Sequence, residues 1–313
     1  METEGKIFLE KITENVGKVI VGKEKTVKLM LTAMLADGHI LLEDVPGTGK
    51  TKLAKSIAKS LNISFSRIQF TPDLLPSDIT GINVFNRKEN DFVLRKGPVF
   101  TNILLADEIN RATPRTQAGL LECMEERQVT IDGETLKLDA PFFVIATQNP
   151  IESAGTFNLP EAELDRFVMK LSVGLPDKDE EIDILNKYMG ADPLDTLTSV
   201  ADASEFMRIR KSASEVKMQA CIPEYIADIA QASRNHPEIS LGVSTRGSIA
   251  LMRCAKAYAY ISGRDFVVPD DVKDVAVPVL AHRIKLGIGV GNPNKVIAGM
   301  MAGVKVPTED FSK

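Results

Sequence analysis

Residues 41–51 read LLEDVPGTGKT, an apolar strand that runs directly into a glycine-rich loop. Gly47 and Gly49 let the backbone bend so that successive N–H groups converge on phosphate oxygens. Lys50 brings a mobile positive charge to the β- and γ-phosphates of a nucleotide, and the Thr51 hydroxyl can ligate Mg²⁺. The helix that follows presents the positive end of its dipole to the same phosphates. The stretch therefore predicts a phosphate-binding loop within an α/β fold.

One position departs from the full phosphate-loop pattern G-x-x-x-x-G-K-[ST], which has glycine where this chain has Asp44. The GTGKT end of the pattern is intact, and it carries the groups that touch phosphate. Taken alone, the stretch could also be a glycine-rich turn before an amphipathic helix. A second motif elsewhere in the chain decides between these interpretations.

That second motif is an apolar run at residues 103–106 that ends in two adjacent carboxylates, Asp107 and Glu108. Apolar residues without alternation are typical of a strand buried on both faces of a parallel sheet. Such a strand places its carboxylates at the carboxyl edge of the sheet, where open α/β sheets bind ligands. We expect Asp107 to hold Mg²⁺, directly or through water, and Glu108 to polarise the water that attacks the γ-phosphate. A carboxylate dedicated to water favours an ATP hydrolase or motor over a small-molecule kinase.

Three further residues are candidates whose roles the local sequence leaves open. Asn149 follows an apolar strand at 142–146 and either contacts the γ-phosphate or the attacking water, or serves ordinary Asn-Pro turn chemistry. Arg166 is either a surface cation beside a carboxylate or an arginine finger that acts on a neighbouring subunit's γ-phosphate. Arg246 opens a helix and either reaches ATP from a lid or is a solvated residue of the first turn.

The chain is expected to divide into an α/β domain, residues 1–175, and a helical domain, residues 176–313. The apolar runs and the helical stripes of the first part predict alternating strands and helices. Beyond the strands already described, the expected elements of the α/β part are strands at 40–42 and 65–70, and helices at 7–19, 23–36, 52–61 and 114–127.

Several segments of the chain carry clear turn or loop signals. Residues 71–77 contain two prolines and are expected to form a loop. The segments 80–94 and 129–138 alternate around turn residues, which predicts two hairpins. The helices of the second part are expected most clearly at 180–188, 224–234, 245–262 and 269–284.

Composition limits the classes of protein to which the chain can belong. Its 313 residues suffice for two domains, and no apolar run reaches the length that spans a membrane. The amino terminus lacks the basic and apolar regions of a signal peptide, which favours a cytoplasmic protein. A formal net charge of −5 and the lack of tryptophan disfavour a general nucleic-acid binder. Cys123, Cys221 and Cys254 show no metal-binding spacing, so buried thiols are expected.

Together these residues resemble the AAA+ ATPases, and specifically the MoxR family. The resemblance covers residues 19–284 and is carried by LLEDVPGTGKT, LLADEINRATPRTQAGLLECMEERQVT, FFVIATQNP, LPEAELDRF and STRGSIALMRCAKAYAYISGRDFVVPDDV. It implies an αβα P-loop core with a parallel sheet, followed by an all-helical lid domain, with ATP between them. The two expected hairpins resemble insertions that face the ring's pore or a partner in this branch.

The resemblance also assigns roles to residues. It implies that Asn149 is the sensor-1 residue, Arg166 the arginine finger and Arg246 the sensor-2 arginine. Arg111 is a second arginine near the inter-subunit surface, so the finger is either Arg166 or Arg111. ATP and Mg²⁺ are expected at the segment that lines the adenine pocket, the phosphate loop and the acidic strand, with the metal on Thr51 and Asp107: Val21, Gly22, Pro46, Gly47, Thr48, Gly49, Lys50, Thr51 and Asp107.

Because the finger acts in trans, the resemblance implies a ring, usually of six subunits. It further implies a chaperone-like role with a partner that bears a von Willebrand factor A domain, in which a client protein complex is remodelled or activated. Two other functions stay open. One is an ATP-gated regulatory scaffold with slow, incidental turnover. The other is a nucleic-acid motor, which the mainly acidic second hairpin disfavours.

Overall fold

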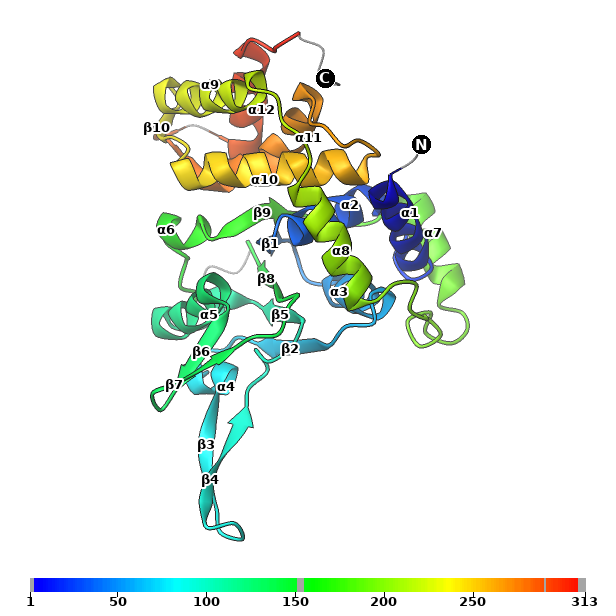
Figure 1. Ribbon diagram of the computed structural model, residues 1–313, viewed down its shortest axis with the longest axis vertical. Helices are drawn as coiled ribbons and strands as arrows, with labels where there is room; N and C mark the ends of the chain where they lie inside the picture. Colours follow the sequence, from blue (N-terminus) through cyan, green and yellow to red (C-terminus); the bar gives the residue numbers. More distant parts are fainter. Residues whose placement is uncertain (1–2, 151–154, 290, 309–313) are drawn as a thin grey trace.

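A five-stranded parallel sheet forms the centre of the computed structural model, which describes residues 3–150, 155–289 and 291–308. The strand order is β2-β5-β8-β1-β9, so strands that are distant in the sequence lie side by side (Figure 1). The strand that bears Asp107 pairs in parallel with the strand that leads to Asn149. The strands are β1 (His39–Glu43), β2 (Phe65–Gln69), β5 (Ile103–Asp107), β8 (Phe143–Gln148) and β9 (Phe167–Leu171).

The sheet is covered by helices on both faces, which gives the three-layered αβα architecture that the sequence predicts. Side chains of a strand alternate between the two faces. Ile40 and Leu42 of β1 pack in the core that includes the helices α1, α2 and α3, whereas Leu41 packs in the core that includes α5. The bounds of these helices are α1 (Glu4–Gly17), α2 (Glu24–Leu35), α3 (Lys50–Ser60) and α5 (Pro114–Glu126).

The second part of the chain is helical, as predicted, apart from a short two-stranded antiparallel sheet. Ile239 anchors this sheet because its side chain is buried while its backbone pairs with Leu286. The helices α8 and α12 were not anticipated, although Asp202 and Asn292 cap their amino termini as a sequence signal would require. The elements are α7 (Lys178–Lys187), α8 (Ala203–Ser214), α9 (Cys221–Asn235), β10 (Ile239–Leu241), α10 (Thr245–Ile261), α11 (Pro269–Leu280), η2 (Ala281–Arg283), β11 (Lys285–Leu286) and α12 (Pro293–Gly303).

Both predicted hairpins are present. Asp132 and Gly133 join β6 (Gln128–Ile131) to β7 (Glu134–Lys137), and both have positive φ, as a tight two-residue turn requires. The longer hairpin, β3 (Gly81–Asn86) and β4 (Asp91–Lys96), projects away from the body of the protein (Figure 1). The expected loop at 71–77 is only partly a loop, because Pro76 starts the short helix α4 (Pro76–Thr80), where the missing N–H of proline costs nothing.

The three cysteines are free and buried, as the sequence predicts. Burial raises the pKa of Cys123 and Cys254 to about 12, which keeps both thiols protonated at neutral pH. The helices within the described residues include no segment long and apolar enough to cross a bilayer.

His39 is a buried histidine whose two ring nitrogens both have partners. Nδ1 accepts the N–H of Val144 at 2.9 Å, so the proton of the neutral ring lies on Nε2, which donates to the carbonyl of Met124 at 3.0 Å. Burial, with a smaller contribution from the nearby Arg127 cation, lowers the pKa of His39 to about 3. His39 is therefore neutral in the folded protein at neutral pH.

We expect this histidine to make the protein less stable in mild acid. Its folded pKa is below the ordinary value of about 6.5, so its stabilising contribution is complete above pH 6.5 and declines as the pH falls toward 3, by about 1.4 kcal/mol per pH unit. His39→Gln keeps one acceptor and one donor but cannot titrate. Urea unfolding at pH 7.5 and pH 5 should therefore show a smaller acid-induced loss for His39→Gln than for the wild type. Equal losses in the wild type and His39→Gln would contradict the expectation.

Candidate active site

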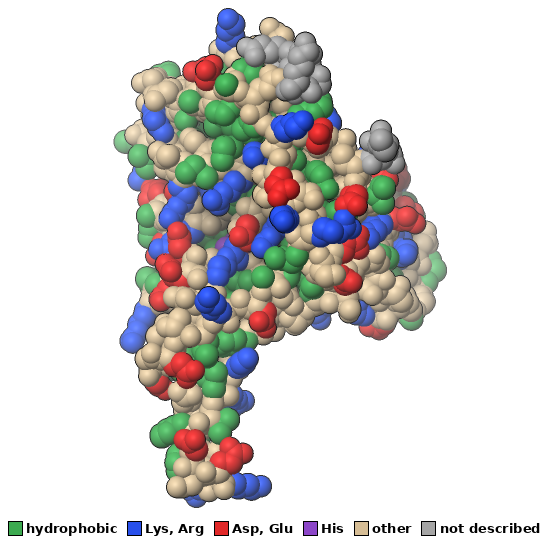
Figure 2. Space-filling view, in the orientation of Figure 1, with side chains coloured by type: hydrophobic (Ala, Val, Ile, Leu, Met, Phe, Trp, Pro, Cys, Tyr) green, Lys and Arg blue, Asp and Glu red, His purple; other side chains and the backbone are tan. Residues whose placement is uncertain are grey.

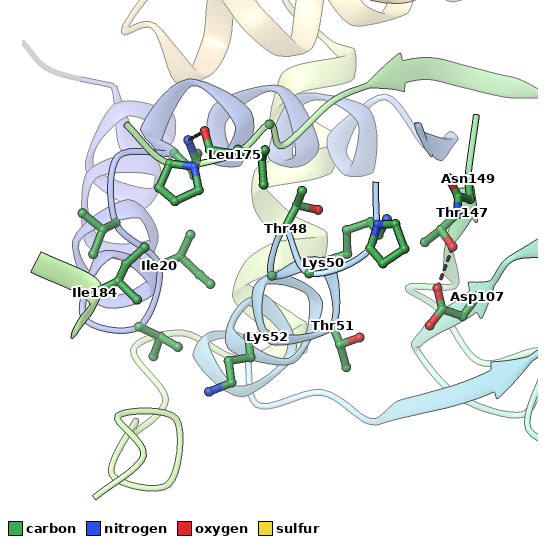
Figure 3. Close-up of a pocket in the computed structure, with 18 of the residues that line it drawn as sticks. Ile20, Thr48, Lys50, Thr51, Lys52, Asp107, Thr147, Asn149, Leu175 and Ile184 are labelled. Carbon is green, nitrogen blue, oxygen red and sulfur yellow. Dashed lines mark hydrogen bonds between the residues drawn. The ribbon is translucent and has the colours of Figure 1, made fainter. Parts of the chain in front are cut away.

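A cavity of about 770 Å³ opens at the carboxyl edge of the sheet, between the phosphate loop, the turn after α1 and the helix α7 (Figure 3). One end is apolar and includes Ile20, Leu175 and Ile184. The other end is polar and contains Asp107, with Lys50 between the two ends (Figure 3). An apolar end and a charged end match the two halves of a nucleotide, a flat base and a chain of phosphates.

The loop at residues 46–49 has the shape of a phosphate cradle. Gly47 and Gly49 have φ of 88° and 84°, a region that side-chain-bearing residues rarely adopt. A Cβ on Gly47 would meet no atom within 4 Å, so the loop faces open space there. The helix α3 begins at Lys50, and its amino-terminal N–H groups belong to the same loop. The loop therefore fits an anion of the size of a phosphate group.

Lys50 is held by its own loop in this structure. Its Nζ donates to the carbonyl oxygens of Asp44 at 2.9 Å and Val45 at 3.2 Å. These are neutral acceptors, and a phosphate oxygen would be a stronger one because it is charged. The ammonium group is thus placed at the loop and has a stronger acceptor to gain when a phosphate arrives.

Both carboxylates of the acidic motif line the cavity and have partners within the chain. Asp107 accepts the Thr147 hydroxyl on Oδ1 at 2.6 Å and pairs with Arg67 through Oδ2, also at 2.6 Å. Glu108 accepts Gln69 Nε2 at 2.8 Å and Arg111 Nη1 at 3.0 Å, both on Oε2. The negative charge at this end of the cavity is therefore offset by two arginines of the same chain.

The backbone of Glu108 is in an unusual conformation. Its φ is 56°, in the left-handed region that glutamate seldom occupies. The Thr147 hydroxyl accepts the Glu108 N–H at 2.8 Å while it donates to Asp107, so one hydroxyl fixes both acidic residues. Strained backbone of this kind is held in place by its surroundings and is common at functional sites.

Thr51 and Asp107, the two residues predicted as oxygen ligands of Mg²⁺, both line the cavity. Hydroxyl and carboxylate oxygens suit this metal, which usually takes one or two protein ligands and fills its shell with phosphate and water. The described residues contain no cluster of three or more His, Cys, Asp or Glu side chains that could hold a metal alone. The donor set therefore fits a metal that arrives with a nucleotide.

Most of the remaining predicted residues lie at the cavity, whereas two arginines lie elsewhere. Val21 and Asn149 line the cavity, and Asn149 lies beside Thr147 and Asp107 (Figure 3). Gly22 lies next to Val21, and its lack of a side chain lets Glu180 of α7 approach, since a Cβ there would be 1.8 Å from Oε1. Pro46, Thr48 and Thr51 also line the cavity.

Arg166 and Arg246 do not line this cavity. Both side chains point to Glu125 of α5: Arg246 Nη2 is 2.7 Å from Oε1, and Arg166 Nε is 3.9 Å from Oε2. They line a separate groove of about 300 Å³. Figure 2 shows Lys and Arg side chains gathered on this face, between the lid helices and the sheet.

Arg67 and Gln69 were missed by sequence reasoning. Both lie on β2, the strand that pairs with β5 along its whole length, and their side chains reach the acidic pair. The signal was available in part, because polar residues at the carboxyl end of a parallel strand face the ligand edge. What the sequence does not reveal is that β2 lies next to β5 in the sheet.

The chain matches two protein families and is similar in sequence to several known proteins. A family model described as "ATPase family associated with various cellular activities (AAA)" matches residues 39–169, and one described as "AAA lid domain" matches residues 231–296. The YeaC protein of Bacillus subtilis is 48% identical and covers 96% of each chain. The chaperone MoxR1 of Mycobacterium tuberculosis is 39% identical over 89% of this chain and 76% of its own.

Two other relatives extend this likeness. The MoxR protein of Paracoccus denitrificans is 31% identical over 86% of each chain. A crystal structure of a protein proposed to be an ATPase, from Cytophaga hutchinsonii, superposes with a TM-score of 0.90 at 37% identity and covers 97% of this chain and 98% of its own.

Proposed function

The chain belongs to the MoxR family of AAA+ ATPases, and from this premise we propose that it hydrolyses ATP with Mg²⁺ as an assembled ring and uses the turnover to remodel a client protein complex. The observation that carries the hydrolytic part is the cavity itself. It brings the phosphate loop, Asp107, Glu108 and Asn149 to one edge of the sheet, although they come from three separate strands.

Each residue of the cavity has a role that its chemistry suits. Lys50 exchanges the carbonyls of Asp44 and Val45 for phosphate oxygens and neutralises their charge. Glu108 takes a proton from the attacking water, for which its carboxylate must turn from Gln69 and Arg111 toward the cavity. Mg²⁺, held by Thr51 and Asp107, would supply positive charge to the phosphates. Asn149 orients the γ-phosphate or the water through its amide.

We place Arg166 and Arg246 at the ATP of a neighbouring subunit. Both lie outside the cavity of their own chain, and both share Glu125, an acceptor that either could leave. Arg111 already contacts Glu108 within the chain, which favours Arg166 over Arg111 as the trans-acting finger. Two arginines that serve a neighbour require a closed assembly, because every site must have a donor subunit. A hexamer in the cytoplasm is the form that we propose.

The partner with a von Willebrand factor A domain and the client complex are also part of the proposal. The β3–β4 hairpin offers a surface for such contacts, since it projects from the body (Figure 1). It exposes Phe85 and Phe92, which form an edge-to-face pair. Exposed aromatic side chains are enriched where proteins bind one another.

A second function, the ATP-gated scaffold, is favoured by one observation. Arg67 and Arg111 engage both acidic side chains of the cavity, and a Glu108 carboxylate paired with Arg111 is a weaker base toward water. In this alternative, ATP binding sets assembly or partner affinity, and hydrolysis is incidental.

Steady-state ATP hydrolysis against protein concentration tests the proposed function. We expect specific activity to rise with concentration, because a site completed by a neighbour's arginine exists only in the assembly. Lys50→Ala should weaken ATP binding about a hundredfold, since it removes a charge-assisted contact to phosphate. Lys59→Ala is its control on the same helix, because Lys59 donates to the Leu194 carbonyl instead. Unchanged ATP binding by Lys50→Ala would contradict the assignment of the loop. If the specific activity does not change with protein concentration, native mass spectrometry would show whether the ring is already assembled at the lowest concentration.

A further inference from the structure

Asp44 occupies the position at which the phosphate-loop pattern has glycine, and its side chain is only 6% exposed. The carboxylate accepts three hydrogen bonds, none of them from the loop. The donors are the Ser172 hydroxyl at 2.6 Å, the Val173 N–H at 2.7 Å and the Gly174 N–H at 3.1 Å. A buried carboxylate that accepts three hydrogen bonds has a specific structural role, so Asp44 is more than a neutral replacement of glycine.

The three donors belong to the linker between the sheet and the lid. The segment 172–174 follows β9 and leads through Leu175 and Pro176 to α7. Leu175 and Pro176 line the nucleotide cavity. Gly174 has a φ of 71°, so the chain turns sharply at the point that Asp44 holds. The carboxylate of Asp44 therefore fixes the start of the path from the core to the lid.

The backbone of Asp44 faces the nucleotide side. Its carbonyl accepts Lys50 Nζ at 2.9 Å, and its N–H donates to the carbonyl of Gln148 at 3.3 Å, the residue before Asn149. One residue thus joins the loop lysine, the end of β8 and the lid linker. The φ of Asp44 is not positive, so the backbone at this position has no need of glycine.

A carboxylate this close to a phosphate cradle also has an electrostatic cost, because like charges repel. Glycine would avoid that cost, but it would leave the buried Val173 N–H without its acceptor. The charge is hydrogen-bonded to the linker, where its three donors lie. The Asp44 carboxylate therefore stabilises the position of the linker, and this offsets the electrostatic cost.

We propose that Asp44 is a positioning residue that couples the phosphate loop to the core–lid linker, so that the state of Lys50 is transmitted through Ser172–Gly174 to α7. The inference rests on the proposed function, since the coupling has a role only if the cavity holds a nucleotide. Phosphate draws Lys50 away from the Asp44 carbonyl, and the backbone of Asp44 shifts in response. Because the Asp44 carboxylate is hydrogen-bonded to residues 172–174, that shift displaces the linker.

The test uses Asp44→Gly, which restores the phosphate-loop pattern, and Asp44→Asn, which keeps the shape. Hydrogen exchange is followed by mass spectrometry in peptides that cover 172–177 and α7, with and without ADP or a non-hydrolysable ATP analogue. For Asp44→Gly we expect exchange at 172–177 to rise about tenfold and its response to nucleotide to be lost. Fluorescent ADP should still bind within about threefold of the wild type, because the loop N–H groups remain. We expect kcat to fall about tenfold at nearly constant KM.

Asp271 supplies the matched control. Its carboxylate is 1% exposed and accepts the Val268 N–H and Arg264 within the lid, away from the cavity. Asp271→Asn should lower the melting temperature without a change in the nucleotide response at 172–177. If it abolishes that response as Asp44→Gly does, the effect is general destabilisation and the inference is overturned.

The remaining outcomes separate the inference from the proposed function. A wild type that binds no nucleotide refutes both. A wild type that binds nucleotide, with an Asp44→Gly variant that responds as it does, overturns the coupling and leaves the function standing. Should Asp44→Gly fail to fold, Ser172→Ala removes one of the three donors, and we expect a partial loss of the response; a full wild-type response in both Ser172→Ala and Asp44→Asn overturns the inference.

Discussion

Glu108→Gln is expected to bind ATP as tightly as the wild type and to hydrolyse it about 10²- to 10⁴-fold more slowly. The amide has the shape of the carboxylate and still offers an oxygen to Gln69 and Arg111. It cannot accept a proton from water at neutral pH, so the step that depends on this group is lost while the cavity keeps its form. Equilibrium binding of a fluorescent ATP analogue measures the affinity, and single-turnover hydrolysis measures the rate of the chemical step.

Glu43→Gln is the matched control for this variant. Glu43 is also a strand-end carboxylate in an ion pair, with Lys170 at 2.6 Å, but it does not line the cavity. It should hydrolyse ATP like the wild type. If Glu108→Gln retains turnover within a few-fold, Glu108 is not the base, and the scaffold hypothesis gains support. A Glu108→Gln protein that holds ATP and accumulates a partner complex would instead favour remodelling driven by hydrolysis.

The phosphate loop and the acidic strand could be predicted because their residues are contiguous. Gly47, Gly49 and Lys50 lie within four positions, and the helix that follows them is fixed by the same local sequence. The buried strands were likewise visible as apolar runs. Their order in the sheet was not, because it depends on packing between segments that are distant in the sequence, such as β2 against β5. Arg67 and Gln69 therefore stayed hidden although they contact the acidic pair.

The position of Arg246 could not be predicted either, because it too depends on contacts between segments that are distant in the sequence. The lid is seated on the core through the buried Arg283, whose Nε is 2.7 Å from Asp165 Oδ1 and whose Nη2 donates to the Phe167 carbonyl at 2.7 Å. These partners are more than 100 positions apart in the chain. Ser244, the N-cap of α10, also donates to Asp165, and Arg246 two residues later pairs with Glu125 of α5 at 2.7 Å.

The same contact gives Arg166 a defined place. Asp165, its neighbour in sequence, is held by Arg283 and by the Ser244 hydroxyl at 3.1 Å, so the lid fixes the backbone that carries Arg166. The guanidinium itself makes a long contact of 3.9 Å with Glu125. An anchored backbone with a loosely held guanidinium is suited to an arginine that must reach across a subunit boundary.

Arg166→Ala should therefore bind ATP normally and lose about 10³- to 10⁵-fold in kcat, the range seen when an arginine finger is removed. ATP binding is spared because Arg166 does not line its own cavity. Arg208→Ala, which removes an exposed arginine paired with Glu4, should leave turnover unchanged.

The decisive measurement mixes Arg166→Ala with Lys50→Ala subunits, each inactive alone. In a ring assembled at random from equal amounts, about a quarter of the interfaces pair an intact cavity with an intact Arg166, because each condition holds for half of the subunits. We expect ATP hydrolysis to recover to about that fraction of the wild-type rate if each interface works independently. A finger that acts within its own chain cannot be rescued in this way. Assembled mixed rings without recovered activity would therefore exclude Arg166 as a trans-acting residue and direct the search to Arg111.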